Sequence, residues 1–156
     1  MKLAALAIRA HVSLLFVALG CASAGARAEA DLEASLTRGG GLSGVTETVH
    51  VWSINATATA DLRRSNSRRT VAVHLSNATL LNILAELDSL AGSLPPGADT
   101  GSVVLLCGDA VTTHLTVRRR REVRVAHEAC PRGSAALDAY WSRVDSLFRV
   151  LANAAR

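Results

Sequence analysis

The sequence predicts an α+β fold in which an antiparallel sheet of five or six strands carries two helices on one face, in the order βββ-α-ββ(β)-α. Segments with alternating apolar and polar residues form two groups, residues 45–75 and 102–125, and leucine- or aromatic-rich segments with three- and four-residue spacing follow each group. Alternation is typical of strands with one buried face, and the longer period is typical of amphipathic helices. No regular βαβ alternation occurs, which favours a layered domain.

The first 28 residues have the layout of a secretory signal peptide. Lys2 and Arg9 give a positive start, residues 12–18 form an apolar run, and Ala26-Arg27-Ala28 offers a small-residue cleavage site. The apolar run is too short for a membrane span. We therefore expect an exported protein, periplasmic or secreted, whose single α+β domain covers residues 29–156.

The charge of this domain is nearly balanced. The 17 Lys and Arg of the whole chain include Lys2, Arg9 and Arg27, so residues 29–156 carry 14 basic and 13 acidic side chains. The basic character of the full chain therefore belongs mostly to the export signal, and it does not indicate a nucleic-acid-binding protein.

The first group of predicted strands precedes a helix. Residues 29–36 are expected to be a lead-in, and the glycine-rich residues 38–44 to be irregular. Alternation then predicts an antiparallel meander with a turn at Ser65-Asn66-Ser67, its strands covering residues 45–52, 54–62 and 70–75.

Each predicted helix begins after a serine. Ser76 is a suitable N-cap for a helix with leucines from Leu80 to Leu90, which Gly92 and Pro95-Pro96 end. Ser134 is a suitable N-cap for the last helix. The apolar stripe of that helix comprises Leu137, Tyr140, Trp141, Val144, Leu147, Phe148 and Leu151.

Between the helices, the sequence predicts an extended segment at residues 102–106 and a strand hairpin with its tip at residues 118–121. Matching the apolar faces would place Leu115 and Val117 opposite Val123 and Val125, a register in which the numbers of facing residues add to an even value.

Cys107 and Cys130 flank this hairpin, and an even pair of cysteines in an oxidising compartment predicts a disulfide bond. Their numbers add to 237, an odd value, so a bulge or frayed strand ends must absorb one residue. Two buried free thiols are the alternative.

Cys21 has a separate interpretation. It follows Ala18-Leu19-Gly20, which loosely matches a bacterial lipobox, so lipidation of Cys21 is an alternative to cleavage after Ala28.

No pattern in the sequence indicates an enzyme, a metal site or a cofactor. The histidines after the signal (His50, His74, His114 and His127) lack metal-binding spacing, and strand histidines facing solvent are expected. Gly41-Leu42-Ser43-Gly44 has the wrong spacing for a nucleophile elbow, and the carboxylates are scattered.

Arginines gather at two predicted turns. Four lie at residues 63–69, and five more are Arg118, Arg119, Arg120, Arg121 and Arg124. If both turns lie at one end of the sheet, nine guanidinium groups share an edge that suits an acidic protein, a phosphorylated surface or a polyanion. The alternative is that they are solvated hairpin tips whose like charges prevent edge-to-edge aggregation.

The segment from Leu36 to Val45, with its Arg38-Gly39-Gly40-Gly41-Leu42-Ser43-Gly44 sequence, resembles the Arg-Ser-Gly-Gly-Phe-Ala-Gly pattern of small emfourin-like bacterial domains. Emfourin is a proteinaceous inhibitor of thermolysin-like metalloproteases. The order of the later elements is also similar, so the resemblance covers most of residues 34–153. Leu42 replaces the aromatic residue of the pattern, and Ser43 replaces the alanine.

The resemblance implies that Arg38, Gly40, Gly41 and Leu42 belong to a contact surface. We therefore expect a small exported, non-catalytic protein-binding domain, with inhibition of a secreted metalloprotease as the most specific form. The alternative is a periplasmic or surface lipoprotein with a structural envelope role, bound to the membrane through Cys21 alone.

Overall fold

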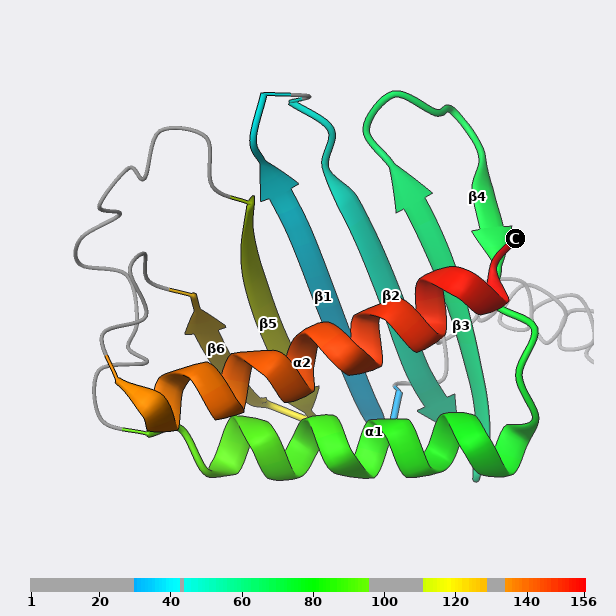
Figure 1. The fold of residues 1–156 in the computed structure, drawn as a ribbon. Helices are drawn as coiled ribbons and strands as arrows, with labels where there is room; N and C mark the ends of the chain where they lie inside the picture. Colours follow the sequence, from blue (N-terminus) through cyan, green and yellow to red (C-terminus); the bar gives the residue numbers. More distant parts are fainter. Residues whose placement is uncertain (1–29, 43, 96–110, 129–133) are drawn as a thin grey trace, which may run out of the picture.

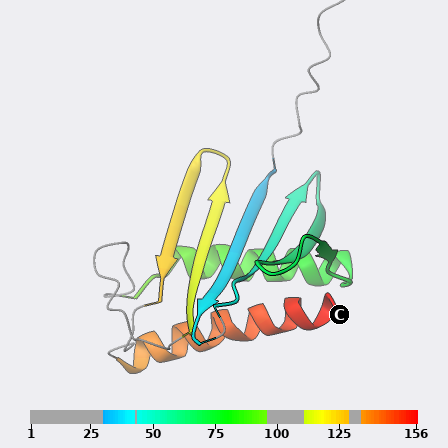
Figure 2. The same cartoon turned by 90° about the horizontal axis from the view of Figure 1, so that it is seen from above.

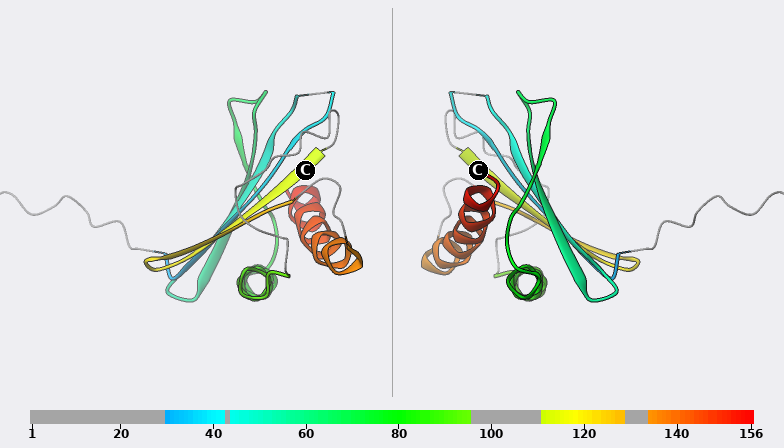
Figure 3. Two further views of the ribbon diagram at one scale, coloured as in Figure 1. Left: turned by 90° about the vertical axis from the view of Figure 1, so that its left-hand side faces the viewer. Right: turned by 90° about the vertical axis from the view of Figure 1, so that its right-hand side faces the viewer.

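Six antiparallel strands form one sheet in the order β4-β3-β2-β1-β5-β6, and two helices cover one of its faces (Figures 1 and 3). The computed structural model describes residues 30–42, 44–95, 111–128 and 134–156. The predicted α+β fold is confirmed. The elements are β1 (Leu32–Gly40), β2 (Glu47–Ile54), β3 (Thr57–Arg64), β4 (Thr70–Ala72), α1 (Asn77–Gly92), β5 (Val111–Arg119), β6 (Glu122–His127) and α2 (Ala135–Ala154).

Strand β1 lies in the middle of the sheet, where the sequence predicted a lead-in at residues 29–36 and irregular structure from residue 38, although residues 38–40 belong to the strand. Leu36 faces Val49 of β2 on one side and Leu115 of β5 on the other. The prediction was wrong because the alternation in this segment is short and depends on small residues, whose burial comes from pairing with β2 and β5. Gly39 remains in the strand because its backbone packs closely on Thr46, whose Oγ1 would lie 2.9 Å from a Cβ at this position.

The register of the β5–β6 hairpin differs from the predicted one. Leu115 faces Ala126 and Val117 faces Arg124, so the numbers of facing residues add to 241, an odd value. A two-residue connection between β5 and β6 sets this register, and Ala126 is the β6 residue that becomes buried. Figure 2 shows the hairpin beside β1.

The observed sum of 241 is odd, like the sum of 237 for Cys107 and Cys130, but the two sums differ by four, so the described register does not make the cysteines facing residues. Both cysteines, like the predicted extended segment at residues 102–106, lie outside the described residues, so the disulfide stays a prediction.

The edge of β3 is only partly covered by β4. Strand β4 is shorter than the predicted residues 70–75, and beyond it the side chain of Asn77 takes the place of a neighbouring strand. The Asn77 Oδ1 accepts from the Ala58 N–H at 2.6 Å, and its Nδ2 donates to the Ala56 carbonyl at 3.2 Å. One amide thus satisfies two backbone groups that an edge would leave free.

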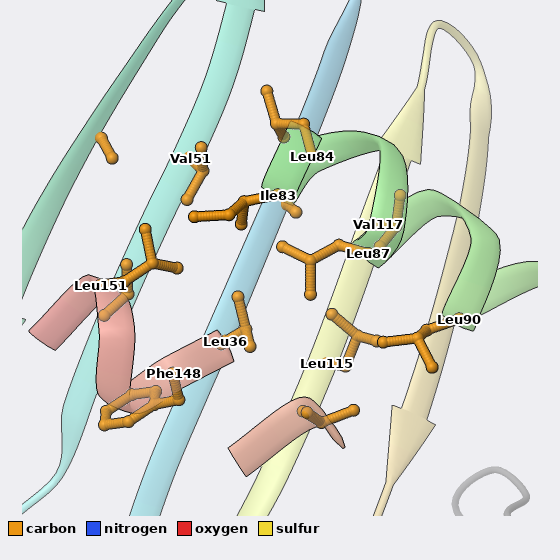
Figure 4. Packing of buried hydrophobic residues seen from close by; sticks show 14 of the residues in the cluster. Leu36, Val51, Ile83, Leu84, Leu87, Leu90, Leu115, Val117, Phe148 and Leu151 are labelled. Carbon is orange, nitrogen blue, oxygen red and sulfur yellow. The ribbon is translucent and has the colours of Figure 1, made fainter. Parts of the chain in front are cut away.

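The hydrophobic core lies between the sheet and the two helices (Figure 4). Both serine N-caps are confirmed, and the two helices are joined by the Tyr140 hydroxyl, which donates to the Leu90 carbonyl at 3.2 Å. Burial raises the pKa of Tyr140 to about 12. Among the described residues, no helix is long and apolar enough to cross a membrane. The α1 and α2 residues in the core include Leu80, Ile83, Leu84, Leu87, Leu90, Trp141, Val144, Phe148 and Leu151.

The β2–β3 turn holds an alanine in a left-handed conformation. Ile54 faces Thr57, so Asn55 and Ala56 form a two-residue connection with φ of 50° and 60°. The sequence predicted a strand over residues 54–62, but Ile54 belongs to β2 and the turn follows it. Two positive φ values favour Asn-Gly, and Ala56 is strained there because its Cβ approaches the backbone.

Replacing Ala56 with glycine is therefore expected to stabilise the protein by about 1 kcal/mol. Urea unfolding followed by circular dichroism measures this change. Ala85→Gly on the exposed side of α1 is the matched control, and it is expected to cost about 1 kcal/mol. Equal destabilisation by both substitutions would contradict the turn assignment.

Candidate functional site

The two arginine clusters lie at opposite ends of the sheet (Figure 1). Strand β5 runs antiparallel to β1, whereas β3 runs parallel to β1 because both pair antiparallel with β2. The turn after β3 therefore lies beside the β1–β2 loop, and the turn after β5 lies at the far end. The prediction that nine guanidinium groups could share one edge is wrong, since strand order decides which turns are neighbours.

The β1–β2 loop and the β3–β4 turn are joined by two hydrogen bonds. The Thr46 N–H donates to the Ser65 Oγ at 2.9 Å, and the Ser65 N–H donates to the Thr46 carbonyl at 2.8 Å. No sequence signal indicated this contact, which depends on β2 and β3 lying side by side. We call this end of the molecule, residues 38–42, 44–48 and 63–70, the loop end.

The described part of the glycine loop, residues 39–42 and 44, contains three glycines in backbone conformations that strain other residues. Gly40, Gly41 and Gly44 have φ of 102°, 70° and 60°, and the Gly44 N–H donates to the Gly41 carbonyl at 3.2 Å. Leu42, between them, is 91 % exposed. Ser43 lies outside the described residues. The backbone of this loop presents a large apolar side chain to solvent.

Five arginines and one carboxylate belong to the loop end. Glu47 pairs with Arg64, with Nε and Oε1 2.6 Å apart. Among the described residues, the side chains of the other four arginines have no hydrogen-bond or ion-pair partner, and three of them are exposed. These four are Arg38, which is half-buried, and the exposed Arg63, Arg68 and Arg69.

These arginines lie on both sides of the sheet. Arg38 and Arg64 face Glu47 from its two neighbouring strands, on the side that the helices cover. Arg63 faces Thr48 on the opposite side, and Arg68 with Arg69 lies at the end of the β3–β4 turn. The positive charge therefore surrounds the loop end instead of forming a patch on one face.

At the far end, most of the predicted arginines are paired with carboxylates of the domain. Arg118 lies 3.5 Å from Glu33, and Arg119 lies 3.7 Å from Asp88. Arg124 pairs with Glu122 at 2.8 Å. Arg120, at a φ of 52°, and Arg121 form the exposed connection between β5 and β6. Four consecutive arginines are thus divided between two faces and a turn, and two of them, Arg118 and Arg119, lie within ion-pair distance of a carboxylate.

The face of the sheet opposite the helices, here called the open face, carries three of the four predicted strand histidines. His50 stacks on Trp52 with ring centroids 4.7 Å apart, and its Nε2 lies 2.7 Å from Glu33. His114 and His127 contact each other through their Nδ1 atoms across the β5–β6 pair. Among the described residues, no three His, Cys, Asp or Glu side chains converge as a metal site would require.

Burial lowers the pKa of His114 below its ordinary value of 6.5, and the neighbouring His127 lowers it further. The charge of Glu128 acts in the opposite direction. Thr37, the partner of His114 on β1, carries no charge. The folded protein therefore favours neutral His114.

A lowered pKa makes stability depend on pH in a defined direction. Because the unfolded chain binds a proton to this histidine more readily, the contribution of His114 is complete above pH 6.5 and is lost as the pH falls towards its folded pKa. We expect the urea concentration at the unfolding midpoint to decrease as the pH is lowered from about 8 to about 5. The decrease should be smaller for His114→Gln. His74→Gln, at an exposed histidine, is the control. An identical pH profile for His114→Gln and the unsubstituted protein would contradict the role of His114.

The structure thus brings together Arg38, Gly40, Gly41 and Leu42, and it separates them from Arg118, Arg119, Arg120 and Arg121. Cys21, Cys107 and Cys130 lie outside the described residues. Comparisons with protein-family models, with curated proteins and with solved structures find no match to this chain.

Proposed function

We propose that the protein is a small exported binding domain that inhibits a secreted thermolysin-like metalloprotease through its loop end. The observation that carries the proposal is Leu42, which is 91 % exposed on a loop shaped by three glycines at positive φ. The motif that resembles emfourin-like inhibitors, Leu36 to Val45, includes this loop.

A leucine in this position contributes nothing to the core of its own domain. Full burial of a leucine side chain in a partner is worth roughly 1.5–3 kcal/mol. A loop that is already compact in the free protein loses less conformational entropy on binding than a flexible loop does. The Gly44–Gly41 hydrogen bond and the Thr46–Ser65 pair hold this loop in place. These features suit insertion of one apolar side chain into a cleft.

Export supports a target outside the cytosol. Cleavage after Ala28 would release the domain, and lipidation of Cys21 would anchor the same domain to a membrane. Intact-mass measurement of the cellular product distinguishes these outcomes, and a mass increase of two hydrogen atoms on reduction identifies the Cys107–Cys130 disulfide. A product that retains Met1 and two reduced thiols would contradict export.

Residues 29–156 should be titrated into thermolysin and related secreted metalloproteases, with hydrolysis of a fluorogenic peptide as the readout. We expect near-stoichiometric loss of activity and an intact inhibitor by mass spectrometry. Full protease activity at micromolar excess of the domain would contradict the proposal. Cleavage of the domain with no loss of activity would identify it as a substrate.

A further inference from the structure

We infer that the partner bound at the loop end presents an apolar pocket with an acidic rim, in which the pocket takes Leu42 and the rim pairs with the unpartnered arginines. This inference rests on the proposed function and names the chemistry of the surface that the domain binds.

The contrast between the two ends of the sheet supports the inference. At the far end, Glu33, Asp88 and Glu122 each lie within 3.7 Å of an arginine side chain. At the loop end, Glu47 is the one carboxylate among five arginines, and it pairs with Arg64. The other four arginines, which lie on both sides of the sheet, have no carboxylate of the described residues within ion-pair distance, and their like charges repel one another in the free domain. An acidic partner would relieve that repulsion.

Protection against aggregation does not account for the arginines on the inner strands. The sheet ends at β4 and β6, and an unpaired edge is where charged side chains prevent strand addition. Arg38 lies on β1 and Arg63 on β3, both of which have a strand on each side. Their charge therefore needs another explanation than the solvated hairpin tips expected from the sequence.

The composition of the loop end favours an acidic protein over a polyanion. Arginine forms bidentate pairs with both carboxylates and phosphates, so the guanidinium groups alone do not decide between them. Leu42 favours an acidic protein, because a highly charged polymer offers no apolar cavity for a leucine side chain. An apolar centre with a charged surround matches the usual arrangement of a protein interface.

The test uses two double variants with the same change in net charge. Arg68→Glu/Arg69→Glu replaces two exposed, unpartnered arginines at the loop end. Arg120→Glu/Arg121→Glu replaces two exposed arginines in the turn at the far end. Association with thermolysin is followed by stopped-flow or surface plasmon resonance. Circular dichroism establishes that both variants are folded.

We expect the association rate constant at about 20 mM salt to fall at least about tenfold for the loop-end variant and to stay within about threefold for the far-end variant. At about 0.5 M salt, charges are screened beyond a few ångströms, so the association rate constants of the two variants should become similar. Equal rates at low salt would overturn the inference while leaving inhibition intact. A loop-end variant that loses heparin binding but inhibits normally would assign the arginines to a polyanion and overturn it also. Absence of inhibition by the unsubstituted domain would overturn both proposals.

Discussion

Replacing Leu42 with alanine is expected to raise the inhibition constant at least about thirtyfold, the equivalent of about 2 kcal/mol for a central interface residue. The free energy of unfolding should change by less than about 0.5 kcal/mol, because a side chain that is 91 % exposed loses almost no contacts within its own domain. A large effect on binding with no effect on stability separates a contact residue from a structural one.

Progress curves of protease activity against inhibitor concentration give the inhibition constant, and urea unfolding gives the stability. Val123→Ala is the matched control, since Val123 is 49 % exposed and lies on β6 near the far end of the sheet. The contact role of Leu42 would be refuted by an unchanged inhibition constant, or by equal losses in the two variants.

Replacing Trp141 with alanine is expected to destabilise the domain by about 3–5 kcal/mol. Trp141 is 1 % exposed and makes an edge-to-face contact with Tyr140, their ring centroids 5.1 Å apart. Its removal leaves a cavity between α2 and the sheet that neighbouring side chains fill only in part. Of all the substitutions considered, this one should cost the most stability.

The change in unfolding free energy is measured by urea denaturation with far-ultraviolet circular dichroism, since the substitution removes one of the two tryptophan fluorophores. Val150→Ala on the exposed side of the same helix is the control and should stay within about 0.5 kcal/mol. Trp141→Phe provides a folded intermediate case should the alanine variant fail to fold. A loss below about 1 kcal/mol for Trp141→Ala would contradict the packing of α2 on the sheet.

The helices were predictable because their signals are local. Ser76 and Ser134 cap helices whose leucines and aromatic residues repeat every three or four positions, and both helices begin where the sequence places them. Strand β1 was not recognised, because its sequence is short in large apolar residues and ends in glycines. Its burial comes from neighbours on both sides, which are distant in sequence.

The candidate site was predictable only in part, for the same reason. The motif from Arg38 to Gly44 is local and pointed to the glycine loop. The separation of the arginine clusters depends on β1 lying between β2 and β5, a pairing that no local pattern specifies. The hydrogen bonds between Thr46 and Ser65 likewise depend on strand order alone.

The central place of β1 has a consequence for how the chain acquires its fold. Glu33 and Arg118 face each other although they are 85 positions apart in the sequence, so one side of β1 has no partner until β5 has been made. Pairings between distant segments close late because a long connecting chain must first be ordered. In a nascent chain that ends after α1, the edge of β1 that pairs with β5 would be unpaired and accessible to other molecules. We therefore expect folding to finish only after ribosomal synthesis has passed Arg119.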